Sequence, residues 1–156
     1  MTAVPEASHE IVKRVMLAVS GGSSDERIVR VACALARPNK AELIAVHVVE
    51  IGWDLPLDAD VAGRSEEAQR VLDMVEGTAE NERMKVETVL LQARDVGPAI
   101  VDEASERDAD LLILGLPYKK RFGGDFAIGR TVPYVLKNAP CAVMVIREPM
   151  TEESSK

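Results

Sequence analysis

The sequence predicts a single α/β domain built on an open, mostly parallel five-stranded sheet with helices on both faces. Three observations lead to this fold class. The chain has 156 residues, of which 47% are hydrophobic, enough for one sizeable core. Five short, continuous apolar runs are typical of strands that are covered on both faces. Helical patterns separate these runs, and this alternation favours right-handed crossovers between parallel strands.

The strands are expected wherever apolar residues follow one another without a polar alternation. The five runs are residues 15–19, 43–49, 86–91, 111–114 and 142–146. The second run contains His47, and a lone histidine on an apolar strand is typical of a satisfied core residue rather than of a ligand or base. The strands therefore account for most of the predicted core.

Helices are expected between the strands, where apolar residues recur three or four positions apart. The first carries a capping box, with Ser23 at the N-cap and Glu26 three residues later, and Pro38 is expected to end it. The other three are expected over residues 68–79, 96–107 and 132–138. The resulting order is β-α-β-α-β-α-β-α-β.

The domain is expected to span residues 13–148, between a flexible tail at residues 1–12 and a polar tail at residues 149–156. Neither tail shows a strand or helix period. No apolar run approaches the ~18 residues of a membrane span, and the first residues do not resemble a signal peptide. We therefore expect a cytoplasmic protein without membrane insertion.

The charge distribution argues against some partners and draws attention to one loop. The formal net charge of −7 disfavours nucleic acid or an anionic membrane as a partner. Within residues 115–132, however, four basic residues face a single acid, Asp125. The basic residues are Lys119, Lys120, Arg121 and Arg130. Positive charge is thus concentrated in one segment of an acidic chain.

This basic, glycine-rich loop is the candidate functional site. It joins a strand to a helix N-terminus, where free N–H groups and the helix dipole favour an anion. Gly129 permits close approach to phosphate, Arg130 can bind phosphate oxygens, and Thr131 can cap the helix or donate its hydroxyl. Residues 124–131 have Walker A glycine spacing with arginine in place of lysine, but they lie too far from the strand for a P-loop. The alternative is a solvated loop.

Catalytic and metal chemistry find little support in the sequence. The two histidines, one of them His9 in the tail, form no catalytic triad. Cys33 and Cys141 lie among apolar neighbours without metal-ligand spacing. The acids of residues 50–64 are typical of a solvated loop rather than of a calcium site. We therefore expect a protein that is not an enzyme and binds no structural metal.

The chain resembles the universal stress protein (UspA-like) family over about residues 13–148. Four segments carry this resemblance: Val19-Ser20-Gly21-Gly22 followed by Asp25-Glu26-Arg27, then Val46-His47-Val48, the stretch from Ala109 to Gly115, and the stretch from Tyr134 to Cys141. The resemblance implies an adenine-nucleotide alpha hydrolase-like fold with strand order 3-2-1-4-5. It also implies a homodimer joined through the last strand.

In one branch of this family ATP is held at the ends of the first and fourth strands. The resemblance therefore implies a bound adenine nucleotide, with Mg²⁺ as a companion ion. The positions that match the family pocket are Ala18, Ser20, Val48, Gly115, Gly129, Arg130 and Val132. Lys120 and Thr131 are added on the physical grounds of charge and hydrogen bonding.

The sequence departs from the nucleotide-binding pattern at several positions. Tyr118 stands at the second glycine, the following loop is one residue longer, Arg130 replaces a hydroxyl residue, and Ser20 replaces an acid. A serine at that position resembles the family domain of potassium-sensor kinases, whose ligand is a cyclic dinucleotide. The last helix resembles domains attached to amino-acid transporters.

Two main hypotheses follow. The first is a regulatory stress-response protein that binds an adenine nucleotide or a related cyclic nucleotide. The alternative is a nucleotide-free dimeric interaction module that regulates a partner such as a transporter or signalling protein. A third is slow ATP hydrolysis without an identifiable base.

Overall fold

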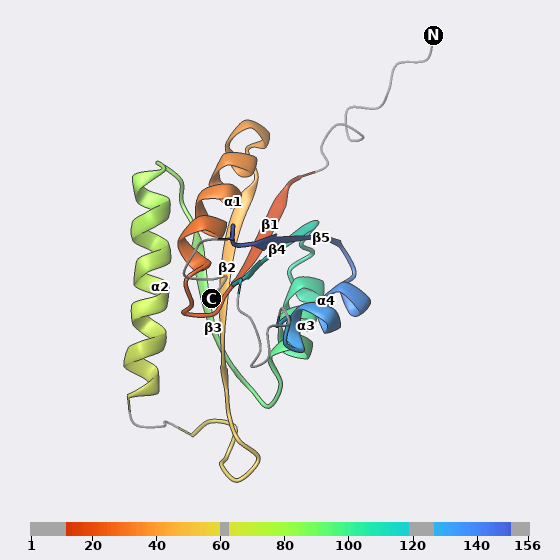
Figure 1. The fold of residues 1–156 in the computed structure, drawn as a ribbon. Coiled ribbons are helices and arrows are strands. Elements are labelled where there is room, and N and C mark those ends of the chain that lie inside the picture. The colour runs from red at the N-terminus through yellow and green to blue at the C-terminus, as the bar shows by residue number, and fades with distance from the viewer. Residues whose placement is uncertain (1–11, 60–62, 119–126, 151–156) are drawn as a thin grey trace.

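The computed structural model describes residues 12–59, 63–118 and 127–150, and within these ranges strands and helices alternate strictly (Figure 1). The elements are β1 (Arg14–Val19), α1 (Asp25–Asn39), β2 (Glu42–Glu50), α2 (Arg64–Asn81), β3 (Glu87–Ala93), α3 (Val96–Glu106), β4 (Leu111–Leu116), α4 (Thr131–Asn138) and β5 (Ala142–Arg147). The predicted fold class and element order are confirmed. No helix in the described residues is both long and apolar enough to cross a membrane.

The five strands form one parallel sheet in the order β3-β2-β1-β4-β5, as the family resemblance implied. β1 therefore lies between β2 and β4, and the winding of the chain reverses there. In open α/β sheets, ligands bind beyond the carboxyl ends of the strands at this reversal. The topology alone places the candidate site next to the ends of β1 and β4.

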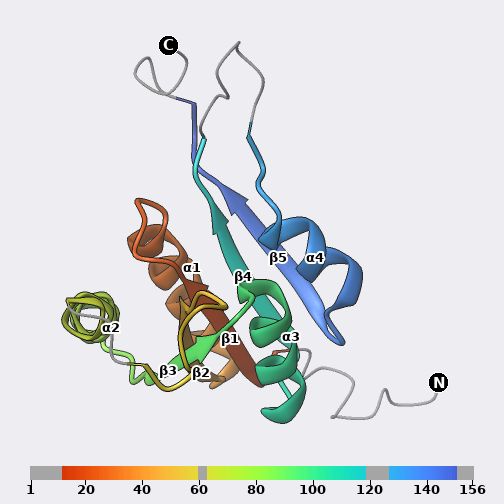
Figure 2. The same cartoon turned by 90° about the horizontal axis from the view of Figure 1, so that it is seen from below.

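Two apolar layers cover the faces of the sheet. Figure 2 shows α1 and α2 on one face and α3 and α4 on the other. On the first face Leu17 of β1 packs with Ile28 of α1, while on the second Met16 of β1 packs with Ile100 of α3. Adjacent β1 residues thus point to opposite layers, which explains why an uninterrupted apolar run was needed.

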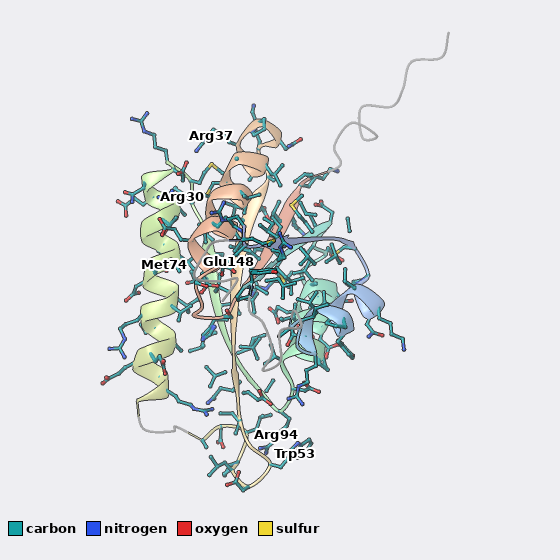
Figure 3. The ribbon with its side chains drawn as sticks, viewed as in Figure 1. Arg30, Arg37, Trp53, Met74, Arg94 and Glu148 are labelled. Atoms are coloured by element: carbon teal, nitrogen blue, oxygen red, sulfur yellow. The ribbon has the colours of Figure 1, made fainter. Side chains whose placement is uncertain are left out.

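The start of α1 differs from the predicted capping box. The helix begins at Asp25 with Ser24 as its N-cap residue, and no side-chain cap hydrogen bond forms. Instead, the hydroxyls of Ser23 and Ser24 both donate to the carboxylate of Glu148, which follows β5 (Figure 3). The prediction was wrong because the helix begins one residue later than the capping box requires, which leaves Ser23 outside the cap position, where its hydroxyl donates to an acid 125 residues away.

The ends of several elements also differ from the predicted ends. α1 continues through Pro38 to Asn39 and closes with Lys40 in the left-handed conformation, at φ 52°. A proline so close to a helix C-terminus removes only one backbone hydrogen bond, so the helix tolerates it. α2 begins before its first buried residue, β3 continues to Ala93, and β4 continues through Gly115 to Leu116.

The loop after β2 is held by an arginine at the end of β3. Arg94 donates from Nη1 to the carbonyls of Gly52 and Leu55, the latter at 2.6 Å. Its guanidinium also lies 5.1 Å from the ring centroid of Trp53, as Figure 3 allows the reader to follow. Trp53 is 83% exposed, and Asp54 and Asp58 are exposed as well. Arg94 thus holds the part of the predicted solvated acidic loop from Gly52 to Leu55, while residues 60–62 lie outside the described residues.

Candidate functional site

A cavity of about 390 Å³ lies beyond the ends of β1, β2 and β4, on the face covered by α3 and α4. It is the site that the topology predicts. All the sequence-predicted binding residues within the described chain line this one cavity: Ala18, Ser20, Val48, Gly115, Gly129, Arg130, Thr131 and Val132. Lys120 lies in residues 119–126, outside the described residues.

The cavity has an apolar floor and a polar rim. The floor comes from alternate residues of the strands and from the facing helices: Ala18, Val46, Val48, Leu114, Ile100 and Val132. The rim carries Ser20, Asp25, Glu50, Arg130 and Thr131. Such a site accepts a flat apolar group on the floor and hydroxyl or anionic groups at the rim.

The rim includes a buried acid that sequence reasoning did not assign to the site. Asp25 is 2% exposed, and its carboxylate accepts hydrogen bonds from the backbone N–H of Ser20 at 3.0 Å and of Gly21 at 2.7 Å. Burial raises the pKa of Asp25, although these two hydrogen bonds act in the opposite direction. The pocket thus has a carboxylate, supplied by the first turn of α1 rather than by the end of β1.

The signal for Asp25 was present but pointed to another role. An acid in the first turn of a helix is explained by the helix dipole alone. In the structure Gly21, with φ +86°, turns the β1–α1 loop back over the carboxylate of Asp25. Only the folded loop brings these groups together.

Arg130, the predicted phosphate ligand, is paired with an acid across the cavity rim. Its Nη2 lies 3.0 Å from Oε1 of Glu50, linking the start of α4 to the end of β2. The side chains are 76% and 48% exposed, so the pair contributes at most about 1 kcal/mol. A phosphate can therefore compete with Glu50 for the guanidinium.

The other residues of the predicted loop have distinct environments. Gly129 has φ +74°, and a Cβ added there would meet no atom of the described residues within 4 Å. Thr131 is the first residue of α4 but does not cap it, because Arg130 occupies the N-cap position. The Tyr118 ring lies 5.0 Å from the Arg147 guanidinium and does not line the cavity.

Metal and thiol chemistry are not supported in the described residues. They contain no group of three or more His, Cys, Asp and Glu side chains that could hold a metal ion. Cys33 is buried and Cys141 is half-buried, and burial raises the pKa of both thiols. A raised thiol pKa disfavours the reactive thiolate.

A parallel α/β sheet with a ligand-sized cavity at its switch point defines a doubly wound α/β domain. The model of the universal stress protein family matches residues 12–147, so the chain belongs to this family. The universal stress protein MJ0531 of Methanocaldococcus jannaschii is 26% identical over 148 residues, which cover 91% of this chain and 86% of that protein.

A second relative is a much longer protein. The sensor protein KdpD of Mycobacterium tuberculosis is 28% identical over 149 residues. The matched region covers 96% of this chain but only 16% of that sensor protein. The similarity therefore concerns one segment of the sensor.

Three solved structures share the fold. The universal stress protein from Archaeoglobus fulgidus in complex with dAMP has a TM-score of 0.69 and 24% identity, covering 87% of this chain and 98% of that one. A universal stress protein in complex with cAMP has a TM-score of 0.64 and 19% identity, covering 88% and 98%. A family protein from Arabidopsis thaliana with AMP bound has a TM-score of 0.63 and 16% identity, covering 92% and 99%.

Proposed function

We propose that this protein is a regulatory stress-response protein that binds an adenine nucleotide, or a related cyclic nucleotide, at the ends of β1 and β4. One observation carries the proposal: the predicted residues from the ends of β1, β2 and β4 and the start of α4 converge on a single cavity of about 390 Å³. The nucleotides in the structures of family members, dAMP, cAMP and AMP, support adenine as the base.

The ligand's parts are assigned from the polarity of the cavity. The base lies on the apolar floor beside Ala18 and Val48, and the sugar hydroxyls face Ser20 and Asp25. The phosphate lies at Gly129 and Arg130, with Thr131 as a hydroxyl donor and Lys120 as a further cation. ATP, with Mg²⁺ as its companion ion, and the monophosphates are all candidates.

Binding rather than catalysis is the proposed role. The cavity rim pairs its only described cation, Arg130, with Glu50 and offers no histidine as a base. We infer a cytoplasmic homodimer joined through β5, which signals ligand occupancy to a regulated transporter or signalling protein. The similarity to one segment of a sensor protein supports a regulatory partner.

The proposal is tested by calorimetric titration with ATP, AMP, cyclic AMP and cyclic di-AMP, with and without Mg²⁺. We expect Arg130→Gln to weaken the best phosphate-bearing ligand by roughly tenfold or more, since a charge-assisted hydrogen bond is worth about 1.5–3 kcal/mol. Adenosine, which has no phosphate, should bind both forms equally.

Arg30→Gln is the matched control. Arg30 is also an exposed arginine paired with a glutamate, Glu26, but it lies outside the cavity. Substitution of Arg30 should leave the affinity for the nucleotide unchanged. An absence of binding heat for every nucleotide would overturn the proposal and favour the nucleotide-free interaction module. The Arg130–Glu50 pair, in which the proposed phosphate ligand already has an acidic partner, is the observation that favours this alternative.

A further inference from the structure

A second and larger cavity, of about 660 Å³, lies on the opposite face of the sheet. It is formed by the loop after β1, the end of β2 and the inner side of α2. Ser20 and Asp25 line both cavities, so the β1–α1 loop is a shared wall. The proposed nucleotide does not account for this second cavity, because α2 takes no part in the first.

His47 of β2 lies at the inner end of this cavity. It is 9% exposed, and its Nδ1 lies 2.8 Å from the carbonyl oxygen of Val19 on the neighbouring strand. Because a carbonyl only accepts, this contact selects the tautomer with the hydrogen on Nδ1, in which Nε2 is an acceptor. Nε2 forms no hydrogen bond with a described residue, and it is not among the fully buried atoms that lack a partner, so it is accessible from the cavity. These contacts agree with the prediction of a satisfied core histidine, and they leave Nε2 as the ring nitrogen that a ligand in the cavity can reach.

The cavity changes from apolar inside to charged at its mouth. Val49 of β2 and Val71 and Met74 of α2 form half-buried apolar walls. Glu67 and Arg70, three residues apart on α2, are exposed at the mouth, and neither forms an ion pair with another described residue. One anion and one cation on neighbouring positions of a helix complement a zwitterion.

We propose that this cavity binds a free amino acid whose side chain ends in a hydrogen-bond donor. The carboxylate of the ligand pairs with Arg70 and its ammonium group with Glu67. The side chain passes Val71 and Met74 and donates to Nε2 of His47. This arrangement gives the accessible Nε2 of His47 a hydrogen-bond donor inside the cavity.

The test uses L-tryptophan, whose indole N–H supplies the donor, and follows the imidazole ¹⁵N resonances of the full chain. The sequence has only two histidines, and a His9→Gln variant assigns them. We expect a saturable shift of the His47 Nε2 signal. L-phenylalanine, which lacks the donor, should bind roughly tenfold more weakly, as expected for the loss of one buried hydrogen bond.

Surface variants test the two charges at the mouth without disturbing the core. Arg70→Gln should weaken tryptophan binding but not binding of tryptamine, which has no carboxylate. Glu67→Gln should weaken both, whereas Glu80→Gln, an exposed change on the same helix outside the cavity, should weaken neither. Any one of three results would overturn the proposal. They are the absence of a His47 shift at millimolar tryptophan, equal affinity for phenylalanine and tryptophan, and full tryptophan affinity in both Arg70→Gln and Glu67→Gln.

Discussion

Gly115, at the end of β4, is a residue that the packing of the fold explains more directly than ligand binding does. A Cβ added there would lie 2.5 Å from Cβ of Ser24 and 3.3 Å from Cγ2 of Ile28, both on the α1 side. Gly129 differs, because its φ of +74° demands conformational freedom while its surroundings are open. The family resemblance assigns both glycines to phosphate contact, but their physical requirements are different.

Gly115→Ala should destabilise the protein by about 1–3 kcal/mol, because the methyl group forces β4 away from α1. Gly77 of α2 is the matched control, since an added Cβ there meets nothing within 4 Å. Gly77→Ala should be neutral or stabilising by up to about 1 kcal/mol. The free energies of unfolding from urea titrations separate the two cases, and equal stability of the two variants would contradict this explanation.

At the scale of elements, the start of α1 is tied to two distant parts of the chain. The carboxylate of Asp25 holds the turn after β1, and the hydroxyls of Ser23 and Ser24 hold Glu148 after β5. The backbone N–H of Glu148 also donates to Leu116 at the end of β4. These contacts fix the loop that forms the wall between the two cavities.

The stability of this turn should depend on pH through Asp25. Burial raises its folded-state pKa above the ordinary value of 3.8, so the folded protein binds this proton more tightly than the unfolded chain does. The burial penalty is fully present above the folded-state pKa. It decreases as the pH falls through that pKa and is absent below 3.8.

We therefore expect the free energy of unfolding of the natural protein to rise relative to that of Asp25→Asn as the pH falls through this window. Urea unfolding of both proteins across the acidic range measures the difference. Asparagine does not titrate, so the variant lacks the contribution of Asp25. The contributions of the other acids, which titrate in both proteins, largely cancel in the difference between the two free energies of unfolding. If the difference in unfolding free energy stays constant or falls with decreasing pH, burial is not the dominant influence on the pKa of Asp25.

For the whole molecule, the two edge strands of the sheet, β3 and β5, have different surroundings. β3 borders the loop that carries Trp53, while β5 is a short strand paired only with β4 in the described chain. The side chains of Val143, Met144, Val145 and Ile146 on β5 are half-buried although all are apolar. An apolar edge strand with unpaired backbone groups is suited to pairing with a second copy.

The proposed homodimer makes a measurable prediction at this edge. Sedimentation should give the mass of a dimer for the natural chain and of a monomer for Val145→Lys, because the lysine places a charge in the paired strands. Leu90→Lys, the same change on the other edge strand, should remain dimeric. Circular dichroism checks that both variants are folded, and a natural chain that sediments as a monomer would contradict the proposal.

The sequence by itself determined the fold class, the order of the elements and the segments from which the candidate pocket is built. These features depend on local information: uninterrupted apolar runs for buried parallel strands, helical periods between them, and glycines at strand ends. Residues such as Ala18, Val48 and Gly129 were assigned through the family resemblance, and they line one cavity because parallel strands bring their carboxyl ends to one edge. Element ends were less predictable, as Pro38 shows.

Which polar groups contact one another depends on how elements far apart in the sequence pack, and it could not be predicted from the sequence. Asp25 brings a carboxylate to the candidate pocket, Arg130 pairs with Glu50 across 80 positions of sequence, and His47 lines a second cavity. The physical reason is the same in each case. A hydrogen bond or ion pair depends on positions to within a few tenths of an ångström, and these are set by packing of elements far apart in the chain, whereas periodicity records only which face each residue occupies.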